Sequence, residues 1–145
     1  MDSVALAATV AACRELLADR FADDADHGAA AMLLDDGTIL TGSAPPAINS
    51  AVELCHETEP YCAAYRLGRA VLASVCLHHE ARRRTLVLSP CGVCRERLAT
   101  HGPQVLAAVP ATTDPTVVSW KSLRELMPDY WMLAFPGELD AGWRS

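Results

Sequence analysis

Two short cysteine-containing fragments constrain the fold of this chain more than any other feature of its sequence. The first is Cys55-His56-Glu57, which follows a loop containing two prolines, and the second is Pro90-Cys91-Gly92-Val93-Cys94. The first cysteines of the two fragments are separated by 91 − 55 = 36 residues. Their thiols can act together only if the fold brings both fragments to one place. We expect each fragment to lie between a strand or loop and a helix.

A zinc ion explains these residue types best. Zinc accepts thiolate ligands, and a catalytic zinc site uses three protein ligands and keeps one position for water. Cys55, Cys91 and Cys94 supply three ligands. Zinc acidifies the water that it holds, and a nearby carboxylate that is not a ligand can then move protons. Glu57, two residues after the first cysteine, is our candidate for that carboxylate.

Other interpretations of the cysteines stay open at this stage. A structural zinc site needs a fourth ligand, and the candidates are His56, His78, Cys62 and Cys76. A redox Cys-x-x-C pair would leave Cys55 and Glu57 unexplained.

Two further cysteines have a simpler interpretation. Cys76 lies in an apolar run and Cys13 lies on the apolar face of a predicted helix. Free cysteine behaves as a small hydrophobic residue, so we expect both to be buried in the core.

The composition limits the class of protein. With 145 residues, 51% of them hydrophobic, the chain suits one domain, residues 1–145, because domains usually span about 100–200 residues. The net charge of −6 argues against a nucleic-acid partner, since phosphate contacts need clustered lysine and arginine. The one basic run, Arg82 to Arg84, is interpreted as a solvated loop.

The sequence also predicts a cytoplasmic location. No lysine or arginine precedes the apolar stretch near the N-terminus, which argues against a secretory signal. No apolar run approaches the ~18 residues of a membrane span. The six cysteines then suggest free thiols in a reducing compartment rather than disulfides.

Apolar periodicity and turn residues predict alternating helices and strands. This alternation favours an α/β fold, a three-layer α/β/α sandwich with a mixed sheet. In chain order we expect a helix capped by Ser3 and ending near Arg20, strands at 29–34 and 38–41, a loop at 43–54, a helix at 61–68, strands at 71–77 and 85–88, a helix at 95–98, a strand at 105–109, and a last helix opened by Ser122 and Glu125.

The two cysteine fragments resemble the motifs of the zinc-dependent cytidine deaminase superfamily, Cys-x-Glu or His-x-Glu followed by Pro-Cys-x-x-Cys. The resemblance runs from Asp35-Asp36-Gly37 to Leu126-Met127-Pro128. It implies a cytidine deaminase-like fold and a hydrolase that removes the exocyclic amine of a cytidine-like nucleoside or related aminopyrimidine as ammonia. It also implies Zn²⁺ on Cys55, Cys91 and Cys94, with Glu57 as the catalytic proton carrier.

The same resemblance implies further contacts and partners. His56, Ser89 and Pro90 would help to hold the base, and Trp131 would supply a late aromatic contact. The partner would be a small nucleoside-like molecule rather than a nucleic acid or a membrane, and the chain would form a homotetramer or homodimer. Independently of the family, a site of three thiolates carries excess negative charge, which Arg95 would offset.

The sequence departs from the superfamily at the sugar-binding segment. Small cytidine deaminases carry Asn-x-Glu-Asn about eleven residues before the zinc cysteine, and here 55 − 11 gives Ala44, followed by Pro45-Pro46-Ala47. These side chains form no hydrogen bonds, although Asn49, Ser50 or Glu53 could substitute. Blasticidin S deaminases also modify this segment, so the resemblance favours an aminopyrimidine with an altered sugar.

Pro60 raises a second question, about the start of the helix. Proline is accommodated in the first turn of a helix, so the helix should begin near Glu59 and leave Cys55 to Glu57 as a tight lead-in. Glu57 and Glu59 are then the two candidates to face the metal, and the Cys-x-Glu spacing favours Glu57.

Two other functions are compatible with the residues. A deaminase of a base in a polynucleotide would need a basic groove, which the net charge argues against. A non-enzymatic zinc-stabilised module would need four protein ligands and would unfold without its metal.

Overall fold

One mixed β-sheet organises the chain. The computed structural model describes residues 1–135, 137–139 and 141–143. Within them the sheet has six strands in the order β2-β1-β3-β5-β6, with β4 also paired to β3. The strands are β1 (His27–Leu34), β2 (Ile39–Gly42), β3 (Val71–Glu80), β4 (Arg84–Leu88), β5 (Leu106–Ala111) and β6 (Asp114–Ser122).

Strand β3 is the centre of the sheet, because it pairs with three other strands. One edge runs antiparallel to β1 along its whole length. The other edge is shared: Ala73 and Ser74 pair in parallel with β5, whereas Cys76 to Glu80 pair antiparallel with β4. This division places Leu88, the end of β4, beside Cys76 in the middle of β3, and the Pro90-Cys91 segment follows from there.

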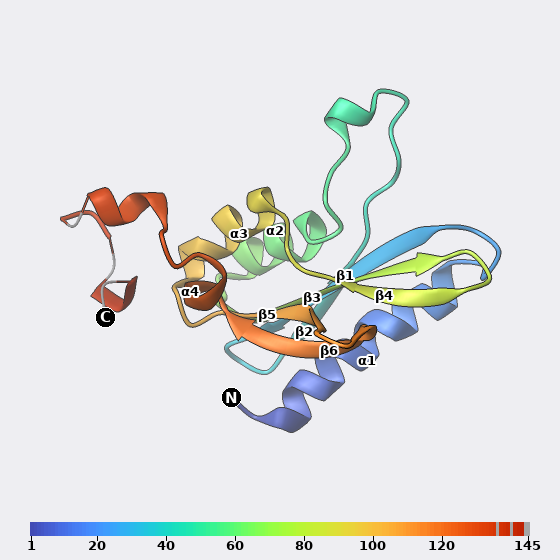
Figure 1. Cartoon of the computed structure of the whole chain (residues 1–145), viewed down its shortest axis with the longest axis horizontal. Coiled ribbons are helices and arrows are strands. Elements are labelled where there is room, and N and C mark those ends of the chain that lie inside the picture. The colour runs from blue at the N-terminus through green and yellow to red at the C-terminus, as the bar shows by residue number, and fades with distance from the viewer. Residues whose placement is uncertain (136, 140, 144–145) are drawn as a thin grey trace.

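Helices cover both faces of the sheet, as Figure 1 shows. Helix α1 (Ser3–Arg20) lies on one face, and α2 (Thr58–Leu67) and α3 (Gly92–Leu98) lie on the other. The short helix α4 (Leu123–Leu126) follows β6 directly and begins with a capping box formed by Ser122 and Glu125. Single 3-10 turns complete the structure at Ser50–Val52, Ala99–His101, Trp131–Ala134 and Ala141–Trp143.

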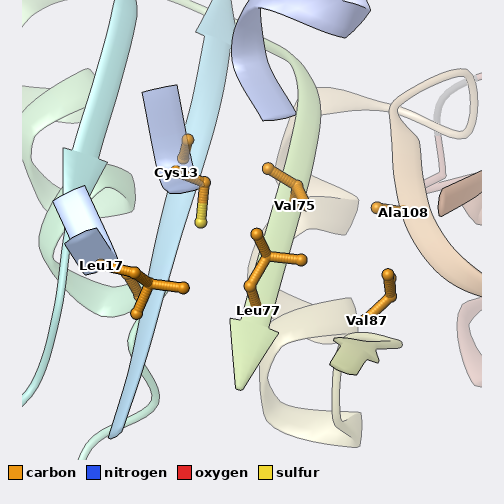
Figure 2. Packing of buried hydrophobic residues seen from close by; sticks show 8 residues of the cluster. Cys13, Leu17, Val75, Leu77, Val87 and Ala108 are labelled. Carbon is orange, nitrogen blue, oxygen red and sulfur yellow. The ribbon is translucent and has the colours of Figure 1, made fainter. Parts of the chain in front are cut away.

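The core between α1 and the sheet is built from small and branched side chains. Cys13 and Leu17 of α1 pack on Val75 and Leu77 of β3, as Figure 2 shows. Burial raises the pKa of the Cys13 thiol to about 12, so it stays an uncharged apolar group. The expectation that Cys13 and Cys76 are buried is confirmed.

A second core lies on the opposite face, under α2 and α3. Met32 and Leu34 of β1 pack with Ala64 of α2 and Leu98 of α3. Side chains of adjacent strand residues point to opposite faces, so β1 serves both cores with its two sets of residues. The helices that carry the cysteine fragments are therefore fixed by buried contacts.

The α/β/α sandwich with a mixed sheet is confirmed, and several element boundaries differ from those expected. The N-cap of α1 is Asp2, whose carboxylate accepts the Val4 N–H, so the predicted cap at Ser3 is wrong. Strand β3 continues to Glu80, and strand β6 was not predicted at all. No helix in the described part of the chain is both long enough and apolar enough to span a bilayer.

Candidate active site

The first cysteine fragment forms the turn that leads into α2. The Cys55 carbonyl accepts the Thr58 N–H at 3.0 Å, and Glu57 is the N-cap residue. Pro60 occupies the third helical position, where the backbone nitrogen needs no partner inside the helix. Its ring packs on Gly42 of β2, where an added Cβ would lie 2.6 Å from the proline Cδ. Helix α2 thus begins one residue before the predicted start, with Cys55 to Glu57 as the tight lead-in.

The second fragment forms the start of α3. Cys91 is the N-cap residue, and Cys94 lies buried in the first turn. The side chain of Arg95 folds back, so that its Nε donates to the Pro90 carbonyl at 2.8 Å. Another nitrogen of the same guanidinium donates to the Leu126 carbonyl at 3.4 Å. These contacts hold a positive charge beside the residue that precedes Cys91.

The fold brings the three predicted metal ligands together. The Sγ atoms of Cys55, Cys91 and Cys94 all lie within 4.8 Å of one another, and those of Cys55 and Cys91 are 3.4 Å apart. Thiolates that share a tetrahedral zinc ion at about 2.3 Å lie about 3.8 Å apart, so the arrangement fits this metal. None of the other candidate ligands belongs to this group in the described part of the chain. Cys91 is exposed, which leaves one side of the group open to solvent.

The electrostatics of the thiols also favour a cation. Burial raises the pKa of Cys55 and of Cys94, and the negative charge of Glu57 raises the pKa of both further. Burial acts in the same direction on Cys91, but hydrogen bonds from the Cys94 and Val93 N–H groups and from neighbouring thiols lower its pKa overall. Three thiolates at this spacing therefore need a positive ion between them.

The carboxylate of Glu57 lies inside the protein next to the thiols. The residue is 6% exposed. Burial, and to a lesser extent the negative charge of Glu57, raises the pKa of the Cys76 thiol on β3, so this thiol stays neutral. Glu59 in contrast is exposed, and its Oε2 accepts the Ser43 N–H at 3.0 Å. Of the two candidate carboxylates, Glu57 faces the cysteines and Glu59 faces the preceding loop.

His56 joins the cysteine fragment to the edge of the sheet. Its Nδ1 accepts the Ala44 N–H at 3.0 Å, which places the proton of the neutral ring on Nε2. Burial lowers the pKa of His56 and favours this neutral form. The ring lies against Gly28 of β1 so closely that a Cβ there would be 2.4 Å from Nε2. The Ser43 hydroxyl donates to the Gly28 carbonyl at 2.6 Å and completes the contact.

A cavity of about 800 Å³ opens beside His56. Its wall comes from the end of α1, the start of β1, the segment Thr41–Pro46 and the side chains of Glu53, Glu59 and His78. Glu53 is the one of the three candidate sugar-binding substitutes that lines the cavity. Asn49 instead uses its side-chain oxygen to cap the turn at Ser50–Val52.

Other predicted site residues lie elsewhere. Ser89 is exposed and Pro90 is buried, and both lie between β4 and the exposed Cys91. Trp131 is 59% exposed, and its indole Nε1 lies 3.2 Å from both carboxylate oxygens of Glu96 on α3. None of the three is among the residues that line the cavity.

The sequence did not identify Gly28 and Ser43 as residues that contact each other beside His56. Gly28 sits in an apolar run where a glycine has no local reason to be, and this was an available signal of close packing. The hydroxyl of Ser43 gives no such signal, because its partner is a backbone carbonyl distant in sequence.

Comparisons with known proteins show which proteins the whole chain is similar to. The chain is 34% identical to the cytidine deaminase from Bacillus anthracis, whose crystal structure superposes with a TM-score of 0.84 over 99% of this chain and 100% of that one. The cytidine deaminase structure from Mycobacterium tuberculosis has 27% identity and a TM-score of 0.64, covering 86% of this chain and 94% of that one. No family model matches the sequence.

Curated proteins give a shorter match. The chain is 36% identical over 74 residues to a cytidine deaminase of Mycobacterium tuberculosis (strain CDC 1551 / Oshkosh). That match covers 50% of this chain and spans about half, 53%, of the curated relative.

Proposed function

The chain belongs to the cytidine deaminase superfamily, and from that membership we propose that it is a zinc-dependent hydrolase that releases ammonia from a cytidine-like nucleoside or related aminopyrimidine. The observation that carries the proposal is the group of three thiols beside a buried carboxylate that is not part of the group. An open three-ligand site with an adjacent acid is the arrangement that hydrolytic deamination requires.

We assign each residue a role in the reaction from its place in the site. Cys55, Cys91 and Cys94 hold the zinc, which when bound supplies the Lewis acidity that makes a water molecule nucleophilic. Glu57 takes one proton from the attacking water and delivers it to the ring nitrogen, and it then carries the second proton of that water to the amine, which leaves as ammonia. Burial of Glu57, which is 6% exposed, limits the access of bulk water to its carboxylate during both transfers.

The remaining residues support binding. Backbone groups at His56, Ser89 and Pro90 hold the base, since these residues adjoin Cys55 and Cys91 in the chain. Trp131 is a further candidate contact, because its bond to Glu96 ties it to the helix that carries Cys94. Arg95 offsets the charge of the thiolates from its place on the Pro90 carbonyl.

We also propose that residues 1–145 act as one domain in a homotetramer or homodimer. Large apolar side chains are exposed on the loop before α2, notably Ile48 and Val52, and on α3 at Val93. Contact between copies would cover them. All six cysteines are free, which supports a reducing, cytoplasmic location.

The test is ammonia release from a panel of cytidine, deoxycytidine, cytosine, blasticidin S, adenosine and guanine, with zinc measured in the same sample. We expect turnover of at least one aminopyrimidine with about one zinc per chain. Glu57→Gln should retain zinc and lose about 10²- to 10⁴-fold in turnover, the usual contribution of a general acid–base. Glu15→Gln, on the exposed side of α1, is the matched control.

Two outcomes would contradict the proposal. A Glu57→Gln protein with full turnover would remove Glu57 from the mechanism. Zinc-loaded protein without turnover on any member, together with unfolding on metal removal, would favour a zinc-stabilised module instead.

A further inference from the structure

The three cysteines of the metal group come from two helices that are distant in the sequence. Cys55 lies in the turn that leads into α2, whereas Cys91 and Cys94 lie at the start of α3. A metal site requires ligand distances within about 0.2 Å of their ordinary values. The affinity of this group for a metal therefore depends on how closely the starts of the two helices are held in place relative to each other.

Each helix start is anchored separately to the chain around it. On α2, the carboxylate of Glu59 accepts the Ser43 N–H at 3.0 Å. On α3, the Arg95 guanidinium donates to the Pro90 carbonyl at 2.8 Å and to the Leu126 carbonyl at 3.4 Å. These bonds join each helix to loops beside it, and none of them runs from one helix to the other.

The side chain of Arg97 connects the two helices, which lie side by side on one face of the sheet in Figure 1. Its Nη1 donates to the hydroxyl of Thr58, the first residue of α2, at 2.9 Å. Both residues are half-buried. Among the described residues no carboxylate forms an ion pair with Arg97, so an ion pair does not account for the place of this charged side chain.

The two bonded residues stand at the same distance in the chain from a cysteine of their own fragment. Thr58 is three residues after Cys55, and its N–H donates to the Cys55 carbonyl at 3.0 Å. Arg97 is three residues after Cys94, so the two lie on one face of α3. The bond between the side chains thus joins the turn that carries Cys55 to the helical turn that carries Cys94.

We propose that Arg97 is a positioning residue of the metal group, whose hydrogen bond to Thr58 fixes the start of α2 relative to α3. Arg97 acts through Thr58 rather than on the ion or the substrate. Arginine suits this task because its donors form a rigid planar fork, so a packed side chain fixes the direction of the bond. The inference concerns the metal site of the proposed deaminase and rests on that proposed function.

The experiment measures metal affinity separately from turnover. Co²⁺, which gives visible absorption bands when thiolates bind it in tetrahedral geometry, is titrated into the metal-free full chain, and the affinity for Zn²⁺ is obtained by competition. Arg97→Met and Thr58→Val each remove one partner of the bond and keep a side chain of similar size. We expect each to lower the affinity about tenfold, as loss of a residue that orients a metal ligand does. Thr58→Ser keeps the hydroxyl and should retain the wild-type affinity.

The double variant tests the bond itself. Because both substitutions remove the same bond, combining Arg97→Met with Thr58→Val should lower the affinity no further than either one alone. Thr58→Val keeps the Arg97 charge, so a tenfold loss in this variant assigns the effect to the bond rather than to the charge. Arg66→Met, at an exposed position of α2, is the matched control and should bind Co²⁺ as the wild type does.

Urea unfolding of the metal-free proteins and ammonia release by the wild type complete the test. Unchanged affinity in Thr58→Val, additive losses in the double variant, or lost stability without lost affinity would overturn the positioning role and leave the deaminase intact. Lowered affinity in both single variants, without turnover of any aminopyrimidine by the wild type, would support the positioning role and overturn the deaminase. If Arg97→Met does not fold, the affinities of Thr58→Val and Thr58→Ser decide by the same criteria.

Discussion

At the scale of single residues, the contact between Gly28 and His56 ties the sheet to the cysteine fragment. A methyl group on residue 28 would lie 2.4 Å from His56 Nε2 and 3.1 Å from the Leu77 carbonyl. We predict that Gly28→Ala displaces the imidazole, lowers the free energy of unfolding by about 1–3 kcal/mol as overpacked sites do, and reduces kcat/KM. Urea unfolding and steady-state kinetics measure the two effects.

The matched control is Gly137→Ala, at a glycine with no neighbouring atom within 4 Å of the added methyl. Adding His56→Ala to Gly28→Ala should recover part of the lost stability, because the imidazole is then absent. If the two losses were simply additive, the contact would not couple β1 to the cysteine fragment.

At the scale of elements, His101 links the turn after α3 to the first residue of β3. Its Nδ1 accepts the Val71 N–H at 3.1 Å, and burial lowers its pKa. The unfolded chain binds this proton near the ordinary value of about 6.5, whereas the folded chain resists it. The stabilisation is therefore complete above that pH and is lost as the pH falls through 6.5 toward the folded pKa.

Replacing His101 with Gln removes the titrating group. We predict that the free energy of unfolding of His101→Gln falls less steeply than that of the wild type between pH 7.5 and 5, by at most about 1.4 kcal/mol per pH unit. Urea titrations across this range measure the two slopes. Parallel curves would mean that His101 is protonated equally in both states.

The elements also show which parts of the structure the sequence could predict. Both ends of α2 follow from local signals. Pro60 favours the first turn of a helix, and Gly68 favours the position just after its last residue. Strand β6 was missed because Pro115 stands near its start, although Val118 to Lys121 alternate between apolar and polar residues as a half-exposed strand does. A strand at the edge of the sheet tolerates such residues, since β6 pairs with β5 alone.

Some features of the candidate site could likewise be predicted from the sequence, and others could not. The grouping of the three thiols could be predicted because the Cys-x-Glu and Pro-Cys-x-x-Cys spacings resemble a known motif. The hydrogen bonds of His56, Glu53 and Glu59 could not be predicted, because each depends on a backbone N–H that only the folded loop presents to it.

At the scale of the whole molecule, the two large clusters of the apolar core lie outside the group of three cysteines, of which Cys94 alone is buried. Neither of the two core clusters contains Cys55, Cys91 or Cys94. We predict that removal of zinc with a chelator abolishes turnover and lowers Tm but leaves the secondary structure folded at 25 °C. Circular dichroism and activity measured on the same samples test this, and restored turnover on adding zinc is the control. Loss of the helical signal on chelation would contradict it.

The loop between β2 and α2 extends away from the sheet in Figure 1. The bond from Ser43 to Glu59 closes its base, and the bond from Ala47 to Glu53 closes its outer part beside the turn Ser50–Val52. Changes of sequence or length beyond these two bonds need not move Cys55, because Glu59 anchors the loop from α2 itself. Mutation can therefore alter this segment while the reaction chemistry is retained. Variants randomised at residues 48–52, none of which lines the cavity beside His56, are therefore expected to keep the reaction.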